Sequence, residues 1–89
     1  MKENWKWFVY ILECLDSSYY VGRTWRVDLR LDQHVSGLGG KYTAKHGVRK
    51  LVYVEEYENF EEASLREKQL KGWTREKKEN LIKGIWTKE

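Results

Sequence analysis

Three ionisable side chains, Arg30, His34 and Glu67, fall on the sides of expected helices that should face a core. Arg30 and His34 are spaced i and i+4, so they lie together at the margin of the apolar side of their helix. An unpaired carboxylate is costly on a buried face, so Glu67 should pair with a base, accept hydrogen bonds or bind a metal ion. Inward-facing polar residues on two helices of one small domain indicate a shared site.

Each of these residues also has a purely structural explanation. Arg30 can lay its stem on apolar surface while its charge stays in water, and His34 can be a core histidine with satisfied hydrogen bonds. An ion pair between Arg30 and Glu67 can tie the two helices together. The residue types alone leave these explanations open.

Two tyrosines, Tyr10 and Tyr20, fall in the strands that should position this site. Residues 6–13 form an expected strand that is apolar on both faces, which is typical of a central strand. A turn signal at residues 16–18 leads into an antiparallel strand over residues 19–23. If the loop has an odd number of residues, the two tyrosines share one face of the sheet.

The middle of the chain predicts a helix, a loop and a strand. Thr24 should cap a helix over about residues 25–36, which the glycines that follow should end. Residues 38–49 are expected to form a basic loop. Residues 51–56, rich in β-branched side chains, predict a third strand.

The last third of the chain predicts two helices. Asn59 and Glu62 form a capping-box pattern for a helix that ends near residue 71, and Thr74 can cap a final helix that ends near residue 83. We therefore expect an α+β fold in the order ββα-β-αα. It is a small three-stranded antiparallel sheet flanked by helices, in a single domain over residues 1–89.

Charge is unevenly distributed along the chain. The net charge is +3 at pH 7 and the pI is about 9.0, which is mildly basic. Residues 33–54 contain no Asp or Glu, and the sign reverses over the glutamate-rich residues 55–62. The basic residues of the first stretch include Lys41, Lys45, Arg49 and Lys50. A solvated surface explains either stretch alone, and a basic stretch is also typical of nucleic-acid contact.

The composition excludes several classes of protein. Cys14 is the single cysteine, so no intrachain disulfide can form, and we expect it to serve core packing. One Cys and two His cannot build a zinc finger. The apolar run over residues 7–12 is too short to span a membrane. We expect a cytoplasmic protein that does not engage a membrane, with its tryptophans in the core.

Six short runs, in this order, resemble the motifs of the GIY-YIG nuclease family. They are Phe8-Val9-Tyr10, Tyr20-Val21-Gly22, Arg30-Leu31-Asp32-Gln33-His34, Gly39-Gly40-Lys41-Tyr42-Thr43, Glu67 within its helix, and Lys78-Glu79-Asn80-Leu81-Ile82. The resemblance extends over nearly the whole chain and is closest to the small stand-alone bacterial members. Phe8 stands where the family has its first glycine.

This resemblance implies a metal-dependent endonuclease that hydrolyses nucleic-acid phosphodiester bonds, possibly in DNA repair or processing. Glu67 would bind one Mg²⁺ or Mn²⁺ ion, and Arg30 would contact phosphate. The catalytic set would comprise Tyr10, Tyr20, Arg30 and His34. Either tyrosine can be the general base, and we favour Tyr20 with Tyr10 as its partner. His34 would hydrogen-bond the attacking water or a tyrosine hydroxyl.

Further residues would contact the nucleic acid: Gly22, Arg23, Lys41, Tyr42 and Lys45. Tyr42 can instead be a loop anchor. DNA is the expected substrate, although these residues do not distinguish it from RNA, and we expect a monomer that a partner protein can target. The main alternative is a non-catalytic nucleic-acid-binding module with the nuclease fold. A protein-interaction domain that uses residues 55–62 is the third hypothesis.

Overall fold

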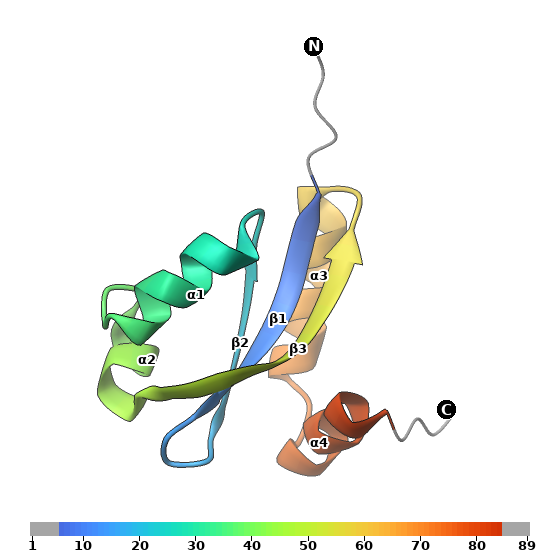
Figure 1. Ribbon diagram of the computed structural model, residues 1–89. Coiled ribbons are helices and arrows are strands. Elements are labelled where there is room, and N and C mark those ends of the chain that lie inside the picture. The colour runs from blue at the N-terminus through green and yellow to red at the C-terminus, as the bar shows by residue number, and fades with distance from the viewer. Residues whose placement is uncertain (1–5, 85–89) are drawn as a thin grey trace.

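Three antiparallel strands form the centre of the fold, in the order β2-β1-β3 (Figure 1). The computed structural model describes residues 6–84. Strand β1 spans Trp7–Cys14, β2 spans Tyr19–Thr24 and β3 spans Val48–Tyr57. The sequence prediction of a three-stranded antiparallel sheet with the first strand in the middle is confirmed.

The register of β1 and β2 decides which side chains share a face. Tyr10 lies opposite Gly22, and Leu12 lies opposite Tyr20. Because side chains alternate along a strand, Tyr10, Leu12 and Tyr20 all project from one face. The last pair of this register is Glu13 with Tyr19, which leaves an odd number of residues, 14–18, between the paired positions, and the two tyrosines share a face as predicted.

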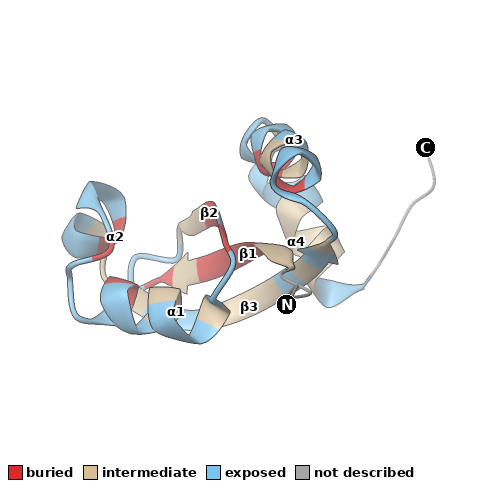
Figure 2. Ribbon diagram, turned by 90° about the horizontal axis from the view of Figure 1, so that it is seen from above, coloured by how far each residue is buried: buried red, intermediate tan, exposed pale blue. Residues whose placement is uncertain are grey.

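Helices cover both faces of this sheet. Helix α1 spans Val27–Val35 and α2 spans Lys41–His46, whereas α3 spans Phe60–Lys71 and α4 spans Arg75–Lys83. Figure 2 shows α1 and α3 on opposite sides of the sheet. The main core lies between the sheet and α3. Strands β1 and β2 contribute Val9, Ile11 and Val21, and α3 contributes Ala63 and Leu70.

Helix α1 begins later than the sequence predicted. Its first residue is Val27, and Arg26 at the N-cap provides no side-chain cap. The Thr24 hydroxyl instead accepts a hydrogen bond from the Arg26 backbone N–H at 3.1 Å, which closes a turn ahead of the helix. This turn places Trp25 at the surface, where it is 43% exposed.

The predicted loop over residues 38–49 is wrong in its middle, because residues 41–46 form α2. The element order is therefore ββααβαα. Gly40 and Gly47 flank this helix with positive φ angles, 146° and 76°, which glycine adopts without strain. The glycines and lysines indicated a loop, but the buried Thr43 side chain anchors this one and a half turns of helix.

The last two helices begin and end as the sequence predicted. The Asn59 side chain accepts from the Glu62 N–H, and Thr74 accepts from the Lys77 N–H. Gly72 ends α3. No helix within residues 6–84 is long and apolar enough to cross a membrane.

Two expectations about the core have different outcomes. Cys14 is fully buried, as expected, and its burial raises the pKa of the thiol. The tryptophans are not simply core residues, because Trp7 and Trp73 are half-buried and Trp25 is exposed. The predictions for the other two tryptophans, at positions 5 and 86, fall outside the described residues.

Candidate active site

A hollow of about 330 Å³ brings together residues that lie far apart in the sequence. Five of the predicted site residues line it, together with two further aromatic residues: Tyr10, Tyr20, Arg23, Arg30 and Glu67, with Trp7 and Phe60. Helices α1 and α3 lie on opposite faces of the sheet. Arg30 of α1 and Glu67 of α3 therefore line the same hollow beside the edge strand β2. The candidate site is therefore at the β2 edge.

Tyr10 forms part of a buried hydrogen-bonded chain beneath the hollow. Its hydroxyl lies 2.8 Å from His34 Nε2, and His34 Nδ1 lies 2.8 Å from Thr43 Oγ1. All three residues are almost fully buried. These hydrogen bonds join β1 to α1 and α2. Of the two contacts predicted for His34, with the attacking water or with a tyrosine hydroxyl, the structure contains the second.

Burial controls the protonation of this chain. Desolvation raises the pKa of Tyr10 to about 12, although the nearby Arg30 guanidinium acts in the opposite direction. Desolvation, with the positive charge of Arg30, lowers the pKa of His34 to about 4. At neutral pH Tyr10 is therefore a protonated phenol and His34 a neutral imidazole, which can donate through one ring nitrogen and accept through the other.

Gly22 makes room for the tyrosines. A Cβ atom at this position would lie 2.5 Å from the Tyr10 hydroxyl oxygen and 3.0 Å from a ring carbon of Tyr20. The Tyr10 side chain thus occupies the space above the Gly22 backbone. Gly22 acts through this spacing and is not among the residues that line the hollow.

Tyr20 joins the hollow to helix α2 through a series of rings. Its ring centroid lies 5.1 Å from that of His34 and 5.8 Å from that of Tyr42. Tyr42 in turn stacks on His46 at 4.1 Å. Tyr42 is 37% exposed, so it flanks the site at the surface and also anchors α2 against Tyr20.

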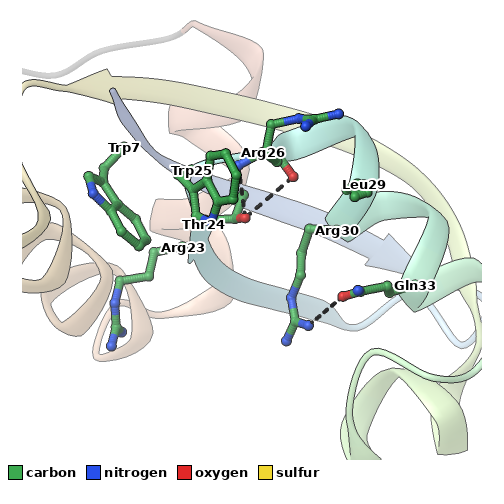
Figure 3. Close-up of a pocket in the computed structure, with 8 residues that line it drawn as sticks. All are labelled: Trp7, Arg23, Thr24, Trp25, Arg26, Leu29, Arg30 and Gln33. Atoms are coloured by element: carbon green, nitrogen blue, oxygen red, sulfur yellow. Dashed lines mark hydrogen bonds between the residues drawn. The ribbon is translucent and has the colours of Figure 1, made fainter. Parts of the chain in front are cut away.

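Arg30 lines the hollow, and two hydrogen bonds hold its guanidinium in place. It donates to Gln33 Oε1 at 2.8 Å and to the Gly39 carbonyl at 2.9 Å. The side chains drawn in Figure 3 show the contact with Gln33. An Arg30–Glu67 ion pair does not form among the described residues, so this structural alternative is wrong.

Glu67 is the buried carboxylate of the site, with its side chain only 8% exposed. It forms ion pairs with Arg23 and, at 2.9 Å, with Lys71 one turn further along α3. The predicted burial of Glu67 is confirmed, and pairing with basic residues is how its charge is compensated. Arg23 also lies over the Phe60 ring, 4.7 Å from its centroid.

Lys41 and Lys45 lie on α2 outside the lining of the hollow. Both are exposed, and Tyr42 between them places this helix beside Tyr20. Thr43 and His46 had no predicted role. His46 pairs with the Asp16 carboxylate. Thr43 follows Tyr42 in one of the motif runs, and this position was the available signal for Thr43.

Outside the hollow, hydrogen bonds from Ser18 and His46 lower the pKa of Asp16.

Two aromatic residues of the hollow were also not foreseen. Trp7 and Phe60 meet edge to face, with ring centroids 4.8 Å apart. Neither belongs to a motif run, and only the fold brings the start of β1 next to the start of α3. Within residues 6–84 there is no cluster of three or more His, Cys, Asp or Glu side chains that would form a metal site from protein ligands alone.

The chain is similar to known proteins over most of its length. The model of the GIY-YIG catalytic domain matches residues 6–80. The chain is 45% identical over 82 residues to a UPF0213 protein of Clostridium perfringens, covering 92% of this chain and 88% of that protein. It is 46% identical over 76 residues to a UPF0213 protein of Staphylococcus aureus, covering 85% of this chain and 93% of that protein.

Two solved structures share the fold. The solution NMR structure of a UPF0213 protein from Bacillus halodurans has a TM-score of 0.57 and 44% identity, covering 88% of this chain and 83% of that chain. The solution NMR structure of a protein from E. faecalis has a TM-score of 0.62 and 32% identity, covering 100% of this chain and 97% of that chain. This chain therefore belongs to the GIY-YIG catalytic domain family, and its relatives include small bacterial UPF0213 proteins.

Proposed function

We propose that this protein is a divalent-metal-dependent endonuclease that hydrolyses phosphodiester bonds of nucleic acid, with DNA as the expected substrate. One observation carries the proposal: two tyrosines, two arginines and a buried carboxylate line a single hollow at the sheet edge. Membership of a family described as a catalytic domain supports it. The proposed site consists of side chains that four different elements supply.

Arg30 is suited to hold the phosphate. Its guanidinium has five N–H donors in a planar fork that matches phosphate oxygens. The Gln33 and Gly39 contacts use part of this donor set and fix its direction. We therefore assign Arg30 to phosphate binding and to stabilising the charge that builds up during displacement.

Tyr20 is the better candidate for the general base. Tyr10, with a pKa raised to about 12, remains protonated at neutral pH and shares a hydrogen bond with His34. Tyr20 lines the hollow next to the cationic side chains of Arg23 and Arg30, where an attacking water can lie. Tyr20 would take a proton from water, whose oxygen bonds to phosphorus as the phosphodiester P–O bond to the leaving oxygen breaks, while the Tyr10 hydroxyl helps to orient the reacting groups.

Glu67 suits a hard divalent cation. Its carboxylate lines the hollow and already has two cationic neighbours, and each oxygen has a further lone pair. Glu67 would hold one Mg²⁺ or Mn²⁺ ion, with water and phosphate oxygens as the other ligands. When bound, this ion supplies charge stabilisation at the phosphate and the leaving oxygen.

A second candidate function rests on the ion pairs of Glu67. Arg23 and Lys71 compensate its charge without a metal ion, which favours a nucleic-acid-binding module in which Glu67 is structural. This alternative predicts salt-dependent binding without cleavage in any divalent ion.

Nicking of supercoiled plasmid tests the proposal. Wild-type protein should nick DNA in Mg²⁺ or Mn²⁺ and not in EDTA. Arg30→Ala should lose at least about 100-fold in rate, as for removal of a positioned charge stabiliser. Lys68→Ala removes an exposed positive charge of α3 and should leave the rate unchanged. Absence of nicking by folded wild type on plasmid, single-stranded DNA and RNA would refute the nuclease proposal in favour of the binding module.

A further inference from the structure

A second hollow, of about 360 Å³, adjoins the candidate active site. The two hollows share three lining residues, Trp7, Arg23 and Arg30. Its volume falls at the lower end of the roughly 300–1,000 Å³ typical of small-ligand sites. A ligand held at the first hollow can therefore extend directly into the second.

Apolar and aromatic surface forms one wall of this second hollow. Trp25 and Leu29 are each 43% exposed and both line it. Trp25 lies in the turn between β2 and α1, which Thr24 closes by its hydrogen bond with the Arg26 N–H. Figure 3 shows Trp7 and Trp25 beside this end of β2. Two large aromatic side chains at a partly open hollow provide a surface on which a flat ring can stack.

The charge around the hollow is positive. No Asp or Glu is among its lining residues in the described part of the chain, and three arginines are. Arg26 donates to both carboxylate oxygens of Asp28 at 3.1 Å, and its guanidinium carbon lies 5.8 Å from the centroid of the Trp25 ring, so its charge already has partners. Arg23 and Arg30 extend in the same direction from β2 and α1, away from Arg26 (Figure 3). Arg23 pairs with Glu67 through Nη1, and Arg30 donates to Gln33 and to the Gly39 carbonyl, so each guanidinium keeps further N–H donors. These two arginines border both hollows and are the ones placed to hold an anionic group between them.

We propose that the second hollow is a nucleobase subsite, which stacks an unpaired base on Trp25 while the adjoining phosphate lies between Arg30 and Arg23. This inference rests on the proposed function, because it takes the phosphate to be bound at the first hollow. A base presents a flat aromatic face to tryptophan whatever its identity. The subsite therefore contributes affinity and strand position rather than sequence specificity. A base paired and stacked within a duplex does not offer this face, so the base must be unpaired.

Binding of a labelled single-stranded DNA oligonucleotide in EDTA, followed by fluorescence anisotropy, tests the subsite apart from catalysis. Trp25→Ala should weaken binding by about 5- to 150-fold, the effect of losing one base–aromatic stack. Trp25→Phe keeps an aromatic ring and should restore most of the affinity. Leu65→Ala is the control, because Leu65 is an apolar residue of α3 that is 70% exposed and outside both hollows.

Oligonucleotides with a single abasic nucleotide provide a second measurement that needs no variant. In oligonucleotides only long enough to fill the site, which bind in a single register, an abasic nucleotide should weaken binding to wild type most at one position, and Trp25→Ala should lose this dependence. Equal affinities of wild type and Trp25→Ala, or a loss that is the same at every abasic position, would overturn the subsite even if cleavage persists. Trp25-dependent binding by a protein that cleaves nothing would support the subsite and refute the nuclease proposal.

Discussion

At the level of single residues, the protonation states of Tyr10 and His34 limit which side chain can act as the general base. Tyr10 and His34 are buried and hydrogen-bonded to each other, and burial keeps both uncharged at neutral pH. Tyr20 is half-buried and borders the hollow. Tyr10 and Tyr20 therefore have different environments, which the sequence alone did not reveal.

The two tyrosines should respond differently to loss of the hydroxyl. Tyr20→Phe should reduce the cleavage rate by about 100- to 10,000-fold, the usual contribution of a general base. Tyr10→Phe should have a smaller effect, because it removes an orienting hydrogen bond. Single-turnover cleavage rates at saturating protein measure both. A larger loss in Tyr10→Phe than in Tyr20→Phe would reverse the assignment.

His34 should make stability depend on pH. Its pKa is about 4 in the folded protein, below its ordinary value of 6.5, so the unfolded chain binds a proton that the folded one does not. The free energy of unfolding should fall by up to about 3 kcal/mol as the pH drops from the unfolded pKa of 6.5 to the folded pKa of about 4. Above pH 6.5 both states are neutral at His34, and the stability no longer depends on its protonation. Urea unfolding at about pH 7 and about pH 4.5 measures this loss.

His34→Gln provides the control for this effect. Glutamine does not titrate, so the variant should be less stable than wild type at neutral pH but should lose less stability on acidification. If both proteins lose the same free energy between the two pH values, the burial of a neutral His34 is not the cause.

At the level of elements, the close packing of β1 on β2 positions the site. Gly22 is needed because the Tyr10 side chain fills the space above its backbone. Helix α2 is needed because Thr43 holds the far side of the His34 ring. The short elements around His34 thus fix its orientation and, through it, that of Tyr10.

Gly22→Ala should displace Tyr10. The added Cβ would lie 2.5 Å from the Tyr10 hydroxyl oxygen, and overpacking of this kind costs about 1–3 kcal/mol. Cleavage should fall together with stability, as urea unfolding and nicking rates would show. Gly72→Ala is the matched control, because its nearest contact would be an ordinary 3.6 Å. A Gly22→Ala protein with wild-type stability and rate would contradict the role given to this contact.

Local sequence signals predicted most elements, and long-range contacts decided the rest. The Asn59 and Thr74 caps fixed the starts of α3 and α4, since a cap depends on residues three positions apart. Helix α2 was missed because its stability comes from Thr43 reaching His34, a contact that no local pattern records. The buried position of Glu67 was predicted, but its partners Arg23 and Lys71 were not. Arg23 is 44 residues away and meets Glu67 only in the folded chain, whereas Lys71, four residues along the same helix, was a local signal that could have been used.

At the level of the whole molecule, basic surface lies beside the hollow. Lys41 and Lys45 are exposed on α2, and Tyr42 between them reaches Tyr20. We propose that the surface of α2 guides the backbone of a nucleic acid toward the site.

Salt dependence of binding tests this placement. Replacing Lys41 and Lys45 by Gln should weaken binding at low salt and reduce the slope of log K against log salt by about 1 for each lost phosphate contact. The same change at Lys68 and Lys83, exposed residues of α3 and α4, should leave the slope nearly unchanged. Equal slopes for both double variants would indicate non-specific attraction by net charge.

The most direct test of the account compares Glu67→Gln with Glu61→Gln, a change at an exposed glutamate of the same helix. Both plasmid nicking in Mn²⁺ and DNA affinity in EDTA would be measured. We predict that Glu67→Gln binds DNA at least as tightly as wild type but nicks it at least about 100-fold more slowly, whereas Glu61→Gln behaves as wild type in both. Equal nicking by folded Glu67→Gln and wild type would contradict the claim that this hollow is a metal-dependent active site.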